Sequence, residues 1–282
     1  MALLAFQGAG HTHQIGEFKD VVASGLKALK SYQNPDGFFK CDAAHHHRHY
    51  AQAQATLAVC EIYGMSGDEE FRPLAQKAID FALKSQEPMM GGWRYEPRVD
   101  SDLSVTGWFT VALKTAELAG MDVPKANEDL ITVFLNSVQV DGGNKYKYKP
   151  ALESTPTMTA EGLLCRQYLG WDKDDKRLIA GLDYVCENTI NYEDANVYYW
   201  YHATQATYHR GGSHWKKWNS VMAKTVPDAQ VRLGKEAGSW SPFLDRWGAH
   251  GGRLYVTCLS IYMLETYYRQ APLCETREAQ IK

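Results

Sequence analysis

Residues 70–93 read EFRPLAQKAIDFALKSQEPMMGGW, and residues 17–39 read EFKDVVASGLKALKSYQNPDGFF. Both segments place apolar residues three and four positions apart, which is the spacing of one buried stripe along an α-helix. In both, a glutamine (Gln33 or Gln86) and a glycine turn follow the stripe, and this is a typical helix stop. The two glutamines are 53 residues apart, and Gln139 follows after another 53. The sequence therefore predicts a repeated helical unit.

A more apolar segment, rich in small residues, follows each of these turns. The first three such segments are 50–64, 104–120 and 157–170, and two later ones, 196–212 and 252–269, match them in kind. A helix that is apolar on most sides is expected to be buried on most sides. The unit is therefore predicted to be one amphipathic outer helix followed by one inner helix, repeated about five times.

The N-terminal residues 1–13, MALLAFQGAGHTH, have the pattern of the end of such an inner helix. Counting this half unit gives about six helical hairpins, none of which has to be stable alone. We therefore expect an all-α protein with one domain over 1–282, an α/α toroid in which outer helices surround a ring of inner helices. An open superhelical array of helix pairs is the alternative. The half unit also suggests a fragment of a longer protein, with the first inner helix cut short; a plain two-turn N-terminal helix is the alternative interpretation.

Composition excludes several classes of function. The 282 residues carry a formal net charge of −3, so no broad basic surface is available for nucleic acid. The apolar N-terminal run MALLAF is far shorter than the ~20 residues of a transmembrane helix, and it lacks the basic flank of a signal peptide. The compartment is therefore not indicated. The six cysteines are scattered without a Cys-x-x-Cys pair, which favours reduced thiols over a disulfide scaffold.

Two aspartates, Asp100 and Asp102, stand directly before the inner helix predicted at 104–120. An aspartate in this position caps the free N–H groups of the first turn and complements the helix dipole. Alternatively, the pair forms the acidic group of an active site. Both interpretations are open at this stage.

The turns GGWRY (91–95) and GSWSP (238–242), with the glutamine and glycine ends of the outer helices, resemble the Gln-Trp repeats of squalene–hopene cyclases and related terpene cyclases. Protein prenyltransferase β subunits and the thioester domains of complement-type proteins share the same α/α toroid. The resemblance covers nearly the whole chain and implies this fold, but one fold carries unrelated chemistries. No cysteine here lies between glycines, which excludes the complement-type thioester. The Asp-x-Cys pair of the zinc-binding prenyltransferases is absent near Asp100 and Asp102.

Squalene–hopene cyclases carry Asp-x-Asp-Asp-Thr-Ala at the start of one inner helix, and the middle aspartate is the proton donor. Here residues 100–105 read DSDLSV. The resemblance implies Asp102 as the proton donor and Asp100 as its supporting partner. Leu103 replaces the third aspartate and removes one neighbouring carboxylate. The cyclases also enclose their substrate between two toroid-type domains, whereas this chain supplies one.

The segment CDAAHHHRHY (41–50) places histidines just ahead of another inner helix. His45, His47 and His49, together with Asp100 or Asp102, would form a nitrogen and oxygen ligand set that zinc or another divalent metal accepts. A polar loop exposed to solvent is the alternative interpretation.

Aromatic side chains gather near the same predicted ends of the inner helices. Their rings could line a ligand pocket and stabilise a cation, or they could simply pack between helices. A helix N-terminus near Gly252 and Arg253 would in addition suit an anion. The candidate ligand-binding residues are Trp93, Tyr95, Trp108, Tyr198, Tyr199, Tyr201, His202, Trp247, His250 and Arg253.

Three hypotheses for function follow from these observations. The first is a binding or scaffold module whose central cavity takes an apolar or small ligand and whose partner is the missing N-terminal part of a larger protein. The second is an acid-initiated terpene cyclase that uses Asp102 and Asp100. The third is a metal-dependent enzyme with a His/Asp site at the cavity mouth. Whether the chain is an enzyme is left open.

Overall fold

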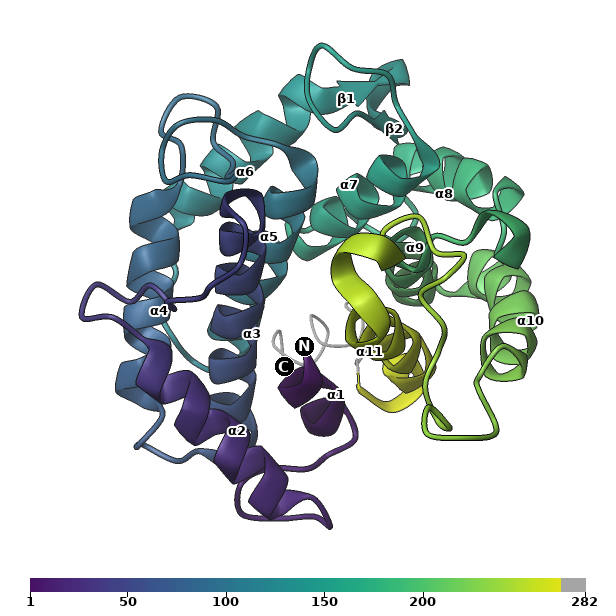
Figure 1. Ribbon diagram of the computed structural model, residues 1–282. Coiled ribbons are helices and arrows are strands. Elements are labelled where there is room, and N and C mark those ends of the chain that lie inside the picture. The colour runs from purple at the N-terminus through teal and green to yellow at the C-terminus, as the bar shows by residue number, and fades with distance from the viewer. Residues whose placement is uncertain (270–282) are drawn as a thin grey trace, which may run out of the picture. The chain divides into compact units, whose positions relative to one another are not determined.

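The computed structural model describes residues 1–269 and is helical apart from one short β-hairpin, β1 (Gln139–Val140) and β2 (Lys145–Tyr146) (Figure 1). The predicted all-α class is confirmed. Within the described residues no helix combines the length and the apolar character needed to cross a membrane. None of the five cysteines in this part of the chain takes part in a disulfide, and Cys274 lies outside it.

The chain packs as two compact units. The first consists mainly of residues Leu3–Val138 and Tyr148–Leu152, and the second of Gln139–Lys147 and the residues from Glu153 onward. The helices of the first unit are α1 (Ala2–Gly8), α2 (Lys19–Tyr32), the 3-10 helix η1 (His45–His47), α3 (Arg48–Ser66), α4 (Arg72–Ser85), α5 (Leu103–Leu118) and α6 (Lys125–Val138).

The first unit contains the predicted pairs of inner and outer helices. The inner helices α3 and α5 pack along each other, α4 lies against both, and α6 lies against α5 (Figure 1). Helix α5 is buried along most of its length, as expected for an inner helix. Helix α4 buries one stripe that contains Leu74, Ala78 and Ala82, as expected for an outer helix.

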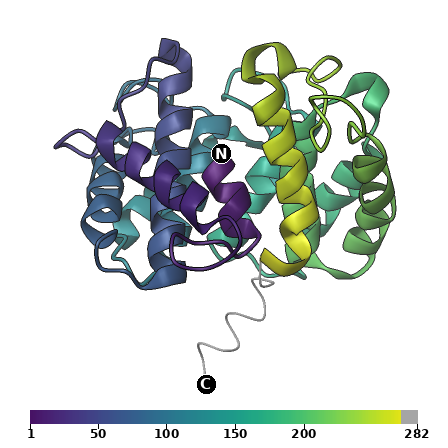
Figure 2. The ribbon, with the colours of Figure 1, turned by 60° about the horizontal axis from the view of Figure 1, so that its bottom comes forward.

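The second unit repeats this arrangement. Its inner helix α9 packs between α7 and α11. The outer helix α8 lies against α7 and α9, and the outer helix α10 lies against α9. Figure 2 shows the long α11 in yellow. In the second unit, the β-hairpin encloses the 3-10 helix η2 (Asp141–Gly143). The helices that follow the hairpin are α7 (Pro156–Tyr168), α8 (Lys176–Glu187), the 3-10 helix η3 (Tyr192–Asp194), α9 (Val197–Arg210), α10 (Gly212–Asp228) and α11 (Gly248–Arg269).

Three helices end in the same way. After α1, α5 and α7 comes a glycine with positive φ (Gly10 at 84°, Gly120 at 76°, Gly170 at 107°). In each case the residue after the glycine donates its N–H to the carbonyl five residues back, which is the Schellman motif. In addition, Gln7 Nε2 donates to the carbonyl of Ala58 in α3 at 2.9 Å. Helix α1 therefore ends like an inner helix, as the sequence predicts.

Two of the three glutamines spaced 53 residues apart, Gln33 and Gln86, connect one repeat to the next. Gln33 Nε2 donates to the carbonyl of Leu74 at 2.9 Å, and Gln86 Nε2 donates to the carbonyl of Asn127 at 3.0 Å. Donor and acceptor are 41 residues apart in both cases. The repeat inferred from the spacing of these residues is therefore present as a repeated contact.

We expect Gln86→Ala to lower the free energy of unfolding by about 2 kcal/mol. The buried Gln86 amide donates to the carbonyls of Gly91 and Asn127 and accepts a hydrogen bond from Asn127 Nδ2, so its loss leaves buried partners unsatisfied. Urea unfolding followed by circular dichroism measures the change. The matched control is Gln76→Ala, whose amide makes one contact, to Asp80, and whose cost should stay near 0.5 kcal/mol. If both variants lower the free energy of unfolding by the same amount, the hydrogen bonds of Gln86 do not stabilise the contact between repeats.

Two tryptophans fasten an outer helix to the inner helix that follows it. The indole N–H of Trp93 donates to a carbonyl of α4 at 2.9 Å, and that of Trp240 donates to a carbonyl of α10 at 2.7 Å. The backbone N–H of each donates to a threonine hydroxyl of the next inner helix, at 3.0 and 3.1 Å. Trp93 was a candidate for ligand binding, but its indole is buried in this contact. The four partners are Ala82, Val226, Thr106 and Thr257.

Candidate functional site: a carboxylate, arginine and tyrosine cluster at the start of α5

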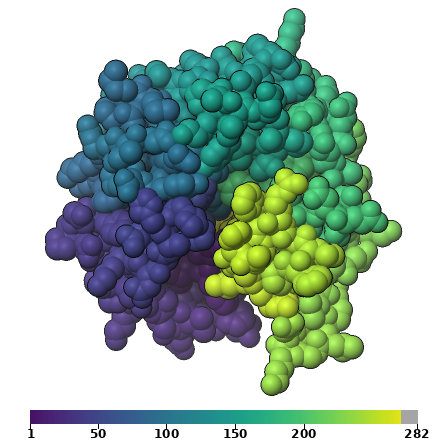
Figure 3. All heavy atoms as spheres, turned by 45° about the horizontal axis from the view of Figure 1, so that its top comes forward, coloured from purple at the N-terminus to yellow at the C-terminus, as the bar shows by residue number. Residues whose placement is uncertain are grey.

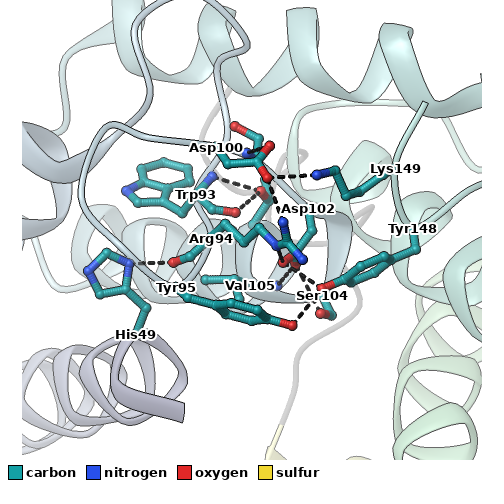
Figure 4. A network of polar contacts seen from close by, with 12 residues as sticks. His49, Trp93, Arg94, Tyr95, Asp100, Asp102, Ser104, Val105, Tyr148 and Lys149 are labelled. Atoms are coloured by element: carbon teal, nitrogen blue, oxygen red, sulfur yellow. Dashed lines mark hydrogen bonds and ion pairs between the residues drawn. The ribbon is translucent and has the colours of Figure 1, made fainter. Parts of the chain in front are cut away.

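Asp102 is the N-cap of α5 and lies at the centre of a polar cluster (Figure 4). Its Oδ1 accepts the backbone N–H of Val105 at 2.9 Å, so the capping interpretation is confirmed. Its own N–H donates to the carbonyl of Trp93 at 2.9 Å, which closes the loop between the two residues. The local sequence therefore places this carboxylate through both the cap and the loop closure.

Both carboxylate oxygens of Asp102 face donors or cations. Besides the Val105 N–H, Oδ1 accepts the Ser104 hydroxyl at 3.1 Å. Oδ2 accepts the Tyr148 hydroxyl at 2.7 Å and lies 3.2 Å from Arg94 Nε, an ion-pair distance without hydrogen-bond alignment. Asp102 is 0% exposed, and this burial raises its pKa above the usual value although the four contacts act in the opposite direction. Such contacts are those of a structural carboxylate.

Asp100 occupies the open side of the same cluster. Its Oδ2 accepts from Arg94 Nη1 and from Lys149 Nζ, both at 2.6 Å, and its Oδ1 accepts the N–H of Ser101 at 2.8 Å. Partial burial raises the pKa of Asp100, but the hydrogen bonds from Lys149 and Arg94 outweigh this effect and hold the pKa below its usual value. Asp100 is therefore an ionised carboxylate held between two cations.

Two phenols complete the cluster. The hydroxyls of Tyr95 and Tyr148 are 2.9 Å apart, and because Tyr148 donates to Asp102, Tyr95 is the donor in their contact. Burial first, and then the charge of Asp102, raise the pKa of Tyr148, so this phenol stays protonated at neutral pH. The guanidinium of Arg94 lies 4.6 Å from the centre of the Tyr95 ring in a cation–π contact.

The sequence analysis identified Asp100, Asp102 and Tyr95, and the structure brings all three together. It missed the other members of the cluster. One signal was present: Tyr148 follows Tyr95 by 53 residues, which is the repeat length. Nothing in the sequence singles out the remaining members, because they are common surface residue types whose partners are distant in the chain. The members that were missed are Tyr50, Arg94, Ser104, Tyr148 and Lys149; Tyr50 joins through a hydrogen bond between its hydroxyl and that of Ser104.

The structure does not assemble the predicted metal site. His45, on η1 with His47, pairs its Nε2 with Glu96 at 2.6 Å. His49 is buried and donates its Nδ1–H to the carbonyl of Arg94, and burial lowers its pKa. Within residues 1–269 no group of three His, Cys, Asp or Glu side chains has a geometry that could hold a metal ion. The histidines and the two aspartates turn to separate partners, so zinc coordination by this set has no geometric support.

Two of the four candidates on α9, Tyr198 and His202, lie beside the buried carboxylate of Glu161, and Tyr201 contacts the ring of His202. Tyr198 donates its hydroxyl to Glu161 of α7 at 2.9 Å, and the ring of His202 lies 4.6 Å from that of Tyr198 and 4.9 Å from that of Tyr201. His202 Nε2 is 3.6 Å from Glu161, and burial lowers the pKa of this imidazole to about 3. Tyr199 points the other way and donates to a carbonyl of α8 at 2.7 Å, so it packs between helices.

The remaining candidates belong to different units. Trp108 is buried on α5, in the first unit. Trp247 is exposed, directly precedes α11 and contacts the ring of His250 in the first turn of that helix; residues of α11 form the yellow surface in Figure 3. Arg253 pairs with Glu236 at 2.6 Å, which leaves its charge compensated rather than open to an anion.

Comparison of the chain with protein-family models finds no match, and comparison with curated proteins finds none either. The class of the protein is therefore described from its own structure. It is an all-α protein of paired inner and outer helices, and at the start of one inner helix it has a polar cluster whose positive and negative charges are paired.

Proposed function

We propose that this chain is a ligand-binding module built on the α/α toroid of the terpene cyclase and prenyltransferase class. The Gln-Trp turns and the contacts repeated between neighbouring hairpins support the repeated unit of this class. A closed ring with a central cavity for an apolar or small ligand is part of the proposal. Binding without acid catalysis is proposed because of one observation, the environment of Asp102.

A carboxylic acid that protonates an alkene must carry its proton and direct it at the substrate. Here Oδ1 of Asp102 accepts from Val105 and Ser104, and Oδ2 accepts from Tyr148 beside the charge of Arg94. All four contacts favour the ionised form, and neither oxygen is left for a substrate. The second carboxylate that supports the donor in cyclases is replaced by Leu103. This environment supports binding over proton transfer.

An acid-initiated terpene cyclase is the second candidate, because burial raises the pKa of Asp102. In this candidate Asp102 is the proton donor and Asp100 its partner. Incubation with squalene, followed by gas chromatography and mass spectrometry, separates the two proposals. A cyclised product that is lost in Asp102→Asn would favour the cyclase, and unchanged squalene would favour the binding module.

The binding proposal is tested with 1,6-diphenylhexatriene, a neutral apolar dye that fluoresces when it leaves water. We expect a saturable increase in fluorescence with a stoichiometry of about one dye per chain. The control is the same titration in a urea concentration that unfolds the protein, where saturation should disappear. A linear increase without saturation in the folded protein would overturn the proposal.

A further inference from the structure

The open side of the cluster holds two cations on a single oxygen. Arg94 Nη1 and Lys149 Nζ both donate to Asp100 Oδ2 at 2.6 Å. The three side chains are between 26% and 28% exposed, so water and a small solute can reach the point where they meet. A guanidinium and an ammonium that converge in this way are the usual protein partners of a carboxylate.

Arg94 is also held by contacts that do not involve Asp100, and the backbone beside Lys149 is anchored through its neighbour Tyr148. Arg94 stacks on Tyr95 and lies 3.2 Å from the buried carboxylate of Asp102. Lys149 follows Tyr148, whose carbonyl accepts the N–H of Leu103 at 3.0 Å and whose hydroxyl donates to Asp102. If the carboxylate of Asp100 moved away, these contacts would keep the guanidinium of Arg94 in place and would keep the backbone of Lys149 beside it.

Asp100 itself is on the least constrained part of the cluster. It belongs to the loop between Trp93 and the start of α5, outside any helix or strand. Two residues before it, Arg98 has a φ of 62°, a left-handed conformation that is strained for any residue other than glycine. A shift of Asp100 would therefore disrupt no helix or strand.

The charges of the cluster favour an incoming anion once Asp100 is displaced. As observed, the two cations Arg94 and Lys149 are balanced by the two carboxylates Asp100 and Asp102. Without the carboxylate of Asp100, two cations face one buried carboxylate, and a net positive charge is left on the open side. A ligand carboxylate would restore the balance.

We infer that Arg94 and Lys149 form the head-group site of the proposed binding module for an amphipathic carboxylate, and that Asp100 occupies this site as an internal substitute. The inference rests on the proposed function. The apolar part of the ligand has exposed partners close in sequence: Val99 precedes Asp100, and Leu152 follows Lys149 by three residues. Displacing Asp100 exchanges one carboxylate for another, so the ligand competes with this side chain.

Isothermal titration with decanoate at pH 7.5 tests the competition. Because the charged hydrogen bonds to Asp100 must be replaced, we expect Asp100→Ala and Asp100→Asn to bind decanoate about tenfold more tightly than the wild type. Lys149→Met should bind about tenfold more weakly than the wild type. The matched control is Asp129→Ala, which removes an exposed carboxylate paired with Lys125 in the same unit and should leave the affinity unchanged. Circular dichroism verifies that each variant is folded.

Two further titrations separate the possible failures. Decanol has the same chain without the charge, so decanol binding with no effect of the Asp100 variants overturns the carboxylate site and leaves the binding module intact. Absence of both decanol and decanoate binding in the wild type and in the Asp100 variants overturns the proposed function as well. Inorganic phosphate that binds Asp100→Ala more tightly than decanoate does would overturn the assignment of a carboxylate ligand.

Discussion

Replacing Trp93 by alanine is expected to lower the free energy of unfolding by about 4 kcal/mol, the range observed for buried Trp and Phe truncations. The indole is 1% exposed, stacks on Phe109 with ring centres 5.0 Å apart, and donates to the carbonyl of Ala82. Alanine would leave a cavity between α4 and α5 and an unsatisfied carbonyl. Chemical unfolding in urea, followed by circular dichroism, measures the loss.

Two variants control for this result. Trp93→Phe keeps a ring against Phe109 but loses the indole N–H, so its cost should be intermediate, about 2 kcal/mol. Trp247→Ala removes a tryptophan that is 46% exposed and should cost less than about 1 kcal/mol. If Trp93→Ala lowers the free energy of unfolding no more than Trp247→Ala does, then Trp93 does not hold α4 and α5 together.

Replacing Asp102 by alanine is expected to cost about 3 kcal/mol, because it removes a helix cap and leaves the charge of Arg94 and the hydroxyl of Tyr148 without their buried acceptor. Asp102→Asn keeps an oxygen for the cap but loses the negative charge, so its cost should be smaller. Thermal and urea unfolding of both variants measure the effect.

The comparison with Asp100 makes this prediction specific. Asp100 is partly exposed and its ion pairs are screened by water, so Asp100→Ala should cost less than about 1 kcal/mol. A proton donor that is not part of the framework would behave differently: Asp102→Asn would remove activity and leave stability intact. That outcome would contradict the structural role of Asp102 and favour the cyclase.

The two aspartates therefore have different tasks although they stand one residue apart. Asp102 is locked by contacts from α5, from the loop before it and from Tyr148. Asp100 faces the open side, where two cations share it. The difference follows from burial, since a buried carboxylate must have partners for both oxygens, whereas an exposed one can exchange its partners for water or a ligand.

Much of the architecture could be predicted because its causes are local. The periodicity of 17–39 and 70–93 predicted outer helices, and α2 and α4 were found there. The small, apolar segment 104–120 predicted a helix buried on most sides, and α5 has this property. The predicted segments 104–120 and 157–170 end at Gly120 and Gly170, and both glycines have the positive φ of a helix stop, which glycine adopts easily.

The candidate site could be predicted only in part. Asp102 before an apolar run indicated a cap, whereas Tyr148 was missed although it follows Tyr95 by 53 residues. A metal shared by the histidine cluster and the aspartates was one of two interpretations of residues 41–50, and in the structure His45 pairs with Glu96 instead. Adjacent histidines in a sequence need not point to one side, because their directions depend on the local backbone and on the partners within reach.

Helix positions, helix ends and the repeat were thus set by information within a few turns of each residue, where periodicity, capping and glycine conformation act. Tertiary packing determined the remaining contacts. It placed Lys149 against Asp100 and Tyr148 against Asp102, and it directed Tyr198 of α9 to α7 but Tyr199 to α8. The physical reason is distance in three dimensions. Lys149 and Asp100 are 49 residues apart in the chain and 2.6 Å apart in space, and no local rule connects them.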